Sequence, residues 1–196
     1  MSVLRAHRRT LMAAGAYVVL ALLVNTGVTA SVDRFALRHL RPLAGSDAMA
    51  VAAPASFPAT VVLVTAGLLA LWLRGRSRVA AVWGAALAAG FVIELVSKEL
   101  VDQIRYAEPQ RVLDLVTLSR SFPSGHSMRA LMLAGIATTL WPRVARPTIA
   151  WALATAGATV VVGIHVPSDA AGGLLAGAAL WSWADCYAQA RATQRT

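Results

Sequence analysis

The sequence predicts an all-α membrane protein: a bundle of six transmembrane helices with a short interfacial helix between the first two spans. Of its 196 residues, 58% are hydrophobic and only 14% are charged. The apolar residues come in blocks of about 20, the length that a helix needs to cross the hydrocarbon core of a bilayer. Short arginine-bearing turns separate the blocks, and the length suits a single domain over residues 1–196. The expected spans cover about residues 11–30, 52–73, 79–101, 122–141, 147–166 and 168–187.

The first span has a second interpretation. It follows Arg5, Arg8 and Arg9 and ends in Val28-Thr29-Ala30, a pattern that is also typical of a cleaved signal peptide. Cleavage would leave the topology of the other spans unchanged.

The segment after the first span predicts the interfacial helix. Within residues 31–42, Val32, Phe35, Ala36 and Leu40 recur at close to helical spacing, with charged residues between them. Such a helix lies in the membrane surface with its apolar face toward the lipid. The alternative is a surface connector without a membrane role.

Charge at the block ends predicts the orientation. Arginines without an acidic neighbour lie on one side of the membrane, and the positive-inside rule makes that side cytoplasmic. We therefore expect a multi-pass plasma membrane protein with both termini in the cytoplasm. Residues 31–51, 102–121 and 166–168 then face the opposite side, where charges of both signs occur. The cytoplasmic arginines are Arg5, Arg8, Arg9, Arg74, Arg76, Arg78, Arg143, Arg146, Arg191 and Arg195.

The net charge of +9 does not indicate nucleic acid binding, because the arginines cluster at the ends of apolar blocks. There they orient the spans and meet anionic lipid headgroups, so we expect membrane lipids as partners and no nucleic acid. Cys186 is the single cysteine, which excludes an intrachain disulfide and a cysteine-based zinc site.

Pro123-Ser124-Gly125-His126 stands where a polar loop turns into an apolar run. Proline suits the first turn of a helix, and a helix N-terminus with open N–H groups is an anion site. Gly125 lets a phosphate approach the backbone, and His126 is placed to give a proton to a leaving oxygen. The alternative is an ordinary helix start with a surface histidine.

The next apolar run ends in His165, followed by Pro167, Ser168 and Asp169. Proline breaks the helix after His165, and Ser168 or Asp169 can cap the next one. Asp169 can also accept a hydrogen bond from one ring nitrogen of His165, which leaves the other nitrogen as a nucleophile. The alternative is that Asp169 only caps a helix and His165 is only an interfacial side chain.

Lys98, the only lysine, ends the third span on the same side as both histidines. With Arg105 it forms a plausible clamp for phosphate oxygens, which need positive charge during phosphoryl transfer. Glu94, one turn earlier, can hold the lysine in place. A snorkelling lysine without a ligand is the alternative.

Taken together, residues 98–173 resemble the type 2 phosphatidic acid phosphatase (lipid phosphate phosphatase) superfamily, as a bacterial integral membrane member. The family motifs are Lys-x6-Arg-Pro, Pro-Ser-Gly-His and Ser-Arg-x5-His-x3-Asp. The second is intact at 123–126. The first has Tyr106 in place of proline, and in the third Ala158-Thr159 replaces the Ser-Arg pair.

The resemblance implies a mechanism and a set of roles. His165, oriented by Asp169, attacks phosphorus and forms a phosphohistidine, and His126 protonates the leaving group. The phosphoryl oxygens are held by Lys98, Arg105, Ser124 and the N–H of Gly125. The resemblance implies no metal or other cofactor.

Thr159 stands where the family has an arginine that contacts phosphate. Arg129, one turn after His126, is a candidate substitute, and Arg120 is a second. A charge inside a span usually has a partner, so an alternative role for Arg129 is an ion pair with Glu94 on an adjacent helix.

These features predict a membrane phosphatase that hydrolyses a lipid phosphate or polyprenyl (pyro)phosphate at the extracytoplasmic face. Phosphatidic acid, phosphatidylglycerol phosphate and polyprenyl pyrophosphate are the substrates that the resemblance suggests. A non-catalytic lipid-binding or lipid-moving relative with a degenerate site is one alternative, favoured by Thr159 and Tyr106. A lipid phosphotransferase that uses the same residues is another.

Overall fold

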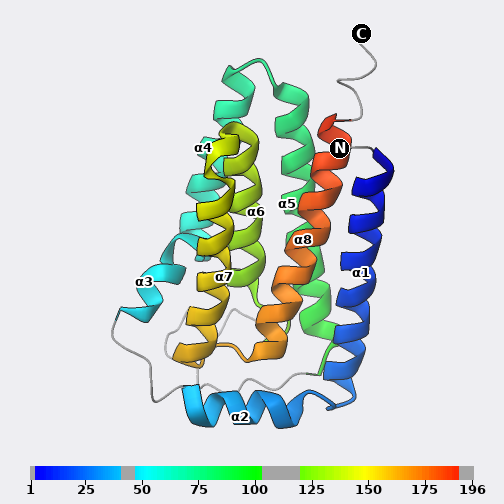
Figure 1. Cartoon of the computed structure of the whole chain (residues 1–196), viewed down its shortest axis with the longest axis vertical. Coiled ribbons are helices and arrows are strands. Elements are labelled where there is room, and N and C mark those ends of the chain that lie inside the picture. The colour runs from blue at the N-terminus through cyan, green and yellow to red at the C-terminus, as the bar shows by residue number, and fades with distance from the viewer. Residues whose placement is uncertain (1–2, 41–46, 103–119, 190–196) are drawn as a thin grey trace.

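The computed structural model describes residues 3–40, 47–102 and 120–189, and within these ranges the chain is helical without strands. Six long helices run side by side along the long axis of the molecule (Figure 1). They are α1 (Val3–Asn25), α4 (Phe57–Leu73), α5 (Ser77–Leu100), α6 (Gly125–Leu140), α7 (Ala145–Val162) and α8 (Pro167–Gln189). The shorter elements are α2 (Ala30–Leu40), α3 (Ala48–Ala52) and the 3₁₀ turns Ala53–Ala55 and Pro142–Val144.

Several of these helices are apolar enough to make this a membrane protein. Among the described residues, three segments have the length and hydropathy of a membrane span: His7–Asn25, Ser77–Leu100 and Pro142–Val162. A fourth arises if Ala48–Ala55 and Phe57–Leu73, bent by 50°, count as one span. The predicted all-α class is confirmed, while the count of six spans stays a prediction. One reason is that α6, with 16 residues, is short for a span and is mostly buried against its neighbours.

The helix ends differ from the expected spans for local reasons. The first helix stops at Asn25 rather than at residue 30, because Gly27 takes the left-handed conformation at φ 76° and α2 starts at Ala30. The second long helix starts at Phe57 rather than at residue 52, after an N-cap at Ser56. The fifth ends at Val162, so His165 lies in a connection between helices.

α2 lies across one end of the bundle (Figure 1). Its buried face carries Asp33 and Ala36, and Ala36 packs in one apolar cluster with residues of α7 and α8. Val32 and Phe35 on its other face are 61% and 64% exposed. The helix expected over 31–42 therefore exists over 30–40, while Arg41 and Pro42 lie outside the described residues.

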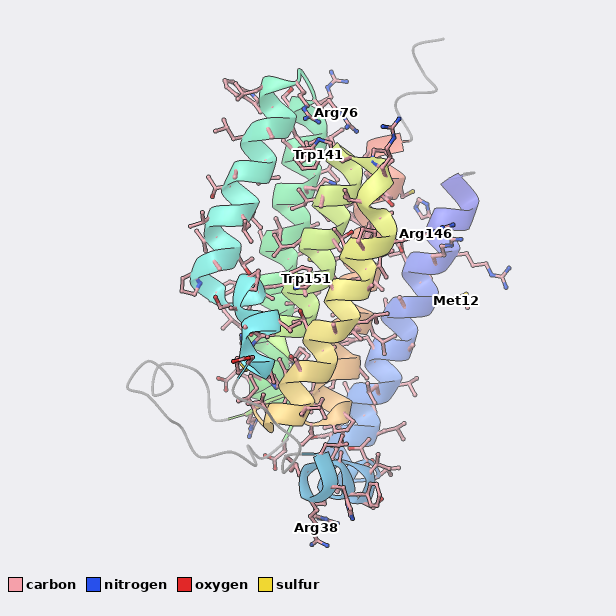
Figure 2. All side chains as sticks on the ribbon, turned by 60° about the vertical axis from the view of Figure 1, so that its left-hand side comes forward. Met12, Arg38, Arg76, Trp141, Arg146 and Trp151 are labelled. Atoms are coloured by element: carbon pink, nitrogen blue, oxygen red, sulfur yellow. The ribbon has the colours of Figure 1, made fainter. Side chains whose placement is uncertain are left out.

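Side chains labelled in Figure 2 mark the two ends of the bundle. Arg76, Trp141 and Arg146 lie toward one end and Arg38 on α2 at the other (Figure 2). At the α2 end also lie the C-terminus of α5 and the starts of α6 and α8 (Figure 1). The described residues Lys98, His126, His165 and Asp169 of the three predicted motifs lie in or directly beside these helix ends, so the topology brings them to one end.

Close helix packing holds α8 against α6. A side-chain carbon at Gly173 of α8 would collide with the backbone carbonyl of Ser124 and would lie 2.9 Å from Cβ of Ser127. Backbone cannot move aside cheaply, so only glycine fits here. At Gly157 on α7, by contrast, such a carbon would meet nothing within 4 Å.

We expect Gly173→Ala to lower the free energy of unfolding by about 1–3 kcal/mol, the usual cost of overpacking. Gly157→Ala is the matched control and should be neutral or stabilising by up to about 1 kcal/mol, because alanine favours helix. Thermal unfolding of the purified variants in detergent measures both. Equal melting temperatures for the two variants would contradict the close α6–α8 contact.

Candidate active site

His165 lies in the connection between α7 and α8, and the local sequence explains its position. Gly163 ends α7 in the left-handed conformation at φ 81°, which glycine adopts without steric cost. Pro167 then begins α8, where its missing N–H has no consequence. The N–H of His165 donates to the carbonyl of Thr159 at 3.2 Å. The histidine is thus held between two helix ends.

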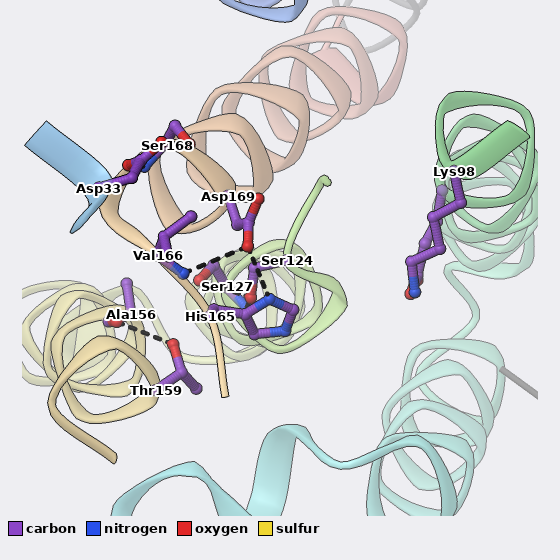
Figure 3. Close-up of polar contacts among 11 residues, drawn as sticks. Asp33, Lys98, Ser124, Ser127, Ala156, Thr159, His165, Val166, Ser168 and Asp169 are labelled. Atoms are coloured by element: carbon purple, nitrogen blue, oxygen red, sulfur yellow. Dashed lines mark hydrogen bonds and ion pairs between the residues drawn. The ribbon is translucent and has the colours of Figure 1, made fainter. Parts of the chain in front are cut away.

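Asp169 orients the imidazole of His165. The Nδ1–H of His165 donates to Oδ2 of Asp169 across 3.3 Å, and the same oxygen accepts the N–H of Val166 at 3.2 Å (Figure 3). Asp169 is fully buried and His165 is 9% exposed. With Nδ1 bonded to a carboxylate, Nε2 keeps its lone pair and is suited to nucleophilic attack.

The first turn of α6 carries the second histidine. Ser124 is the N-cap, and its hydroxyl oxygen accepts the N–H and the hydroxyl of Ser127 at 3.3 and 3.1 Å. The N–H of Ser124 donates to the backbone carbonyl of Asp169 at 2.9 Å, which ties the two motifs together. The ring centroids of His126 and His165 lie 6.2 Å apart. A reacting group between them is within reach of both.

Two cations, the buried Lys98 and the partly buried Arg129, lie beside this turn and are joined by one carboxylate. Oε1 of Glu94 is 2.9 Å from Nζ of Lys98, one turn further along α5. Oε2 of Glu94 is 2.9 Å from Nη1 of Arg129 on α6. Nε of Arg129 donates to the carbonyl of Ala55 at 3.0 Å. Arg129 therefore forms an ion pair with Glu94, which is one of the two roles that we predicted for it from the sequence.

The Glu94–Lys98–Arg129 cluster belongs to the same site as the histidines. A side-chain carbon at Gly125 would collide with Oε1 of Glu94 and would lie 2.5 Å from Nη1 of Arg129. Gly125 therefore lets the cluster contact the N-terminus of α6.

The other candidate cations have different positions. Arg120 donates to the carbonyl of Glu99, and its Nε lies 3.5 Å from Oδ1 of Asp102, so it engages the end of α5. Arg105 lies outside the described residues.

Thr159 is fully buried, and its hydroxyl donates to the carbonyl of Ala156 at 2.9 Å. Its side chain is thus turned to its own helix, while its carbonyl holds the peptide of His165. Thr159 therefore holds His165 through the backbone and brings no charge.

Asp33 is a site residue that the sequence reasoning missed. It is 1% exposed and accepts the N–H and the hydroxyl of Ser168 at 3.1 and 2.7 Å (Figure 3). These bonds satisfy the N-terminus of α8 directly beside Asp169. The sequence signal for a buried role of Asp33 is that this carboxylate lies on the same helix face as the apolar Ala36. No sequence pattern predicts Ser168 as its partner.

A mostly apolar cavity of about 220 Å³ adjoins the cluster. It lies between α4, α5 and α6, and its lining includes Phe57, Phe91 and Met128 together with Glu94 and Arg129.

Comparisons with known proteins agree with this geometry. The family model of the PAP2 superfamily matches residues 98–192. The crystal structure of a transmembrane PAP2-type phosphatidylglycerolphosphate phosphatase from Bacillus subtilis superposes with a TM-score of 0.76. The match covers 90% of this chain and 94% of that one at 18% identity, so it shows a shared fold. No curated protein sequence matches the chain significantly.

The matched segment begins at Lys98 and contains the intact Pro-Ser-Gly-His motif and the His165–Asp169 pair. Residues 98–192 therefore match the PAP2 superfamily, and the chain shares its fold with a solved PAP2-type phosphatase.

Proposed function

We propose that the chain is an integral membrane phosphatase that hydrolyses a lipid phosphate or polyprenyl (pyro)phosphate through a phosphohistidine intermediate. The observation that carries this proposal is the His165–Asp169 pair facing His126 at 6.2 Å between ring centroids. The solved relative is named a phosphatidylglycerolphosphate phosphatase, which supports a lipid phosphate as the substrate class.

In the proposed reaction, Nε2 of His165 attacks phosphorus, and the bond from phosphorus to the leaving oxygen breaks. His126 gives its proton to that oxygen, so the lipid alcohol or lipid phosphate leaves protonated. His126 then takes a proton from water, whose oxygen attacks phosphorus and releases phosphate from His165. Asp169 stabilises the positive charge on the His165 ring while it forms.

The phosphoryl oxygens are bound by positive charge and by N–H groups. Lys98 and Arg129 supply the charge from α5 and α6, and the N–H of Gly125 supplies a donor at the N-terminus of α6. Ser124 adds its hydroxyl hydrogen, since its oxygen already acts as the cap acceptor. Arg105 is a further ligand in this proposal. Arg129 takes the role that the family gives to the arginine replaced by Thr159.

The site faces the extracytoplasmic side in this proposal, with six spans in the plasma membrane and both termini in the cytoplasm. Two findings support it. Arg76 and Arg146 lie at the end of the bundle opposite α2 (Figure 2). Val32 and Phe35 of α2 are exposed apolar residues, as an interfacial helix requires.

One observation favours a second candidate. The side chain of Thr159 donates to its own helix, so the family's third phosphate contact is absent at this position. A lipid-binding relative without catalysis would tolerate that loss. A lipid phosphotransferase, by contrast, would use the same residues and differ only in the acceptor that replaces water.

We expect purified protein in detergent to release phosphate from at least one of phosphatidic acid, phosphatidylglycerol phosphate and polyprenyl pyrophosphate, with EDTA present. His165→Ala should abolish release, because it removes the nucleophile. His39→Ala, at an exposed histidine of α2, is the matched control and should retain activity. Equal release by wild type and His165→Ala would exclude the phosphohistidine route. Added alcohol acceptors, with analysis for a phosphorylated acceptor, separate phosphotransfer from hydrolysis.

Arg129→Ala should lower kcat/KM by about 10²–10³-fold, the range found when one oxyanion donor is removed. Arg129→Lys keeps the charge but loses the guanidinium geometry, so an intermediate loss is expected. Arg120→Ala is the control and should change kcat/KM little. If Arg129→Ala lowers the melting temperature while kcat/KM stays unchanged, the residue is only the ion-pair partner of Glu94.

Asp33→Ala should lower kcat by about 10- to 100-fold with little change in KM, because a displaced His165–Asp169 turn loses its alignment. Asp33→Asn keeps an acceptor for Ser168 and should restore most of the rate. Steady-state kinetics of both variants measure the separate effects on kcat and KM. A change confined to KM, or equal losses in both variants, would argue against this positioning role.

A further inference from the structure

Glu94 shares its two carboxylate oxygens between the two cations of the site. Oε1 lies 2.9 Å from Nζ of Lys98 and Oε2 lies 2.9 Å from Nη1 of Arg129. The side chains of Glu94 and Lys98 are each 10% exposed and that of Arg129 is 15% exposed. Solvent therefore screens these charges weakly, and they depend on one another.

The carboxylate also occupies a place that favours anions. Oε1 of Glu94 lies so close to Gly125 that a side-chain carbon there would collide with it. Gly125 is the first residue of α6, and the N-terminus of a helix attracts negative charge. One internal anion thus contacts Lys98 and Arg129 and lies beside the N-terminus of α6, the three groups that a bound phosphoryl group would use in our proposal.

The charges of the cluster do not balance. Two cations and one carboxylate leave a net charge of +1, so the cluster still attracts an anion. Because Lys98 and Arg129 each already hold one oxygen of Glu94, an incoming phosphate competes with the carboxylate for their hydrogen bonds.

We propose that Glu94 is a built-in counter-anion of the phosphate site. Before substrate binds, the Glu94 carboxylate neutralises part of the positive charge of Lys98 and Arg129. When the phosphoryl group binds, it shares these two cations with the carboxylate or displaces the carboxylate from them. When inorganic phosphate leaves, the carboxylate pairs with both cations again. This role rests on the proposed function in one respect, that phosphate binds at Lys98 and Arg129. It makes Glu94 a residue that weakens product binding and so speeds release.

Glu94→Gln tests this role, because the amide keeps the shape and removes the charge. Inorganic phosphate should bind the variant about tenfold more tightly, the factor for losing roughly one competing charge-assisted contact. Binding is read from the rise in melting temperature with phosphate concentration, which needs no turnover. Glu99→Gln is the matched control: it makes the same charge change on the same helix at an exposed position and should leave phosphate affinity unchanged.

A second variant covers the case in which Glu94→Gln does not fold. Glu94→Asp keeps the charge on a shorter side chain that cannot span both cations, so it should also bind phosphate more tightly than wild type, by a smaller factor. Unchanged or weaker phosphate binding in the folded variants would overturn the proposal and leave Glu94 as a structural partner of Arg129.

The experiments can disprove the proposed hydrolysis and the counter-anion role of Glu94 independently of each other. If wild type hydrolyses no lipid phosphate but Glu94→Gln binds phosphate more tightly than wild type, the counter-anion role stands and hydrolysis does not. If wild type hydrolyses substrate and the variant shows no gain in phosphate affinity or in product inhibition, hydrolysis stands and the counter-anion role is wrong.

Discussion

The hydrogen bond from the N–H of Ser124 to the backbone carbonyl of Asp169, 2.9 Å long, joins the two helix starts that make the site. It fixes the first turn of α6 against the first turn of α8, and so sets His126 opposite His165. Gly173 makes this contact sterically feasible, since any side chain there would strike the carbonyl of Ser124. The separation of the two rings thus depends on backbone packing between helices as well as on side-chain rotamers, and rigid elements of this kind hold reacting groups more accurately than a flexible loop.

Burial of charge is the second constraint. A lone cation in a low-dielectric environment is costly, and a buried pair that loses one member leaves the other uncompensated. Arg129 meets this constraint twice, through Glu94 and through the carbonyl of Ala55 just before α4. α5, α6 and the 3₁₀ turn before α4 are therefore linked by polar contacts at the end of the bundle where the proposed chemistry occurs. The same contacts that stabilise the apoprotein restrict how its cations can meet a phosphate, so stability and affinity oppose each other at Glu94.

The long helices and the His165–Asp169 hydrogen bond could be predicted because both are local in sequence. Blocks of apolar residues gave the elements, and the hydrogen bond between His165 and Asp169 follows from their spacing around Pro167. Contacts between distant residues could not be predicted in this way. Asp33 meets Ser168 only because α2 folds across the end of the bundle, and no local pattern encodes that pairing. The helix start within the expected span at 52–73 differs for a similar reason: the chain bends by 50° between Ala48–Ala55 and Phe57–Leu73, and α3 packs on α7.

Thr159 brings no charge to the proposed site, although the resemblance led us to expect an arginine at this position of α7. In our proposal the positive charge comes instead from Arg129 on α6, which pairs with Glu94 of α5. Thr159 keeps a backbone role, because its carbonyl accepts the N–H of His165, and its small side chain leaves the neighbouring face of α7 free to pack against Ala36 of α2. An arginine at 159 would have to place a charge in that packed region. Arg129 on α6, by contrast, is one of the residues that line the cavity between α4, α5 and α6. A positive charge and an apolar cavity thus lie next to each other, as a ligand with a phosphate headgroup and an apolar tail requires.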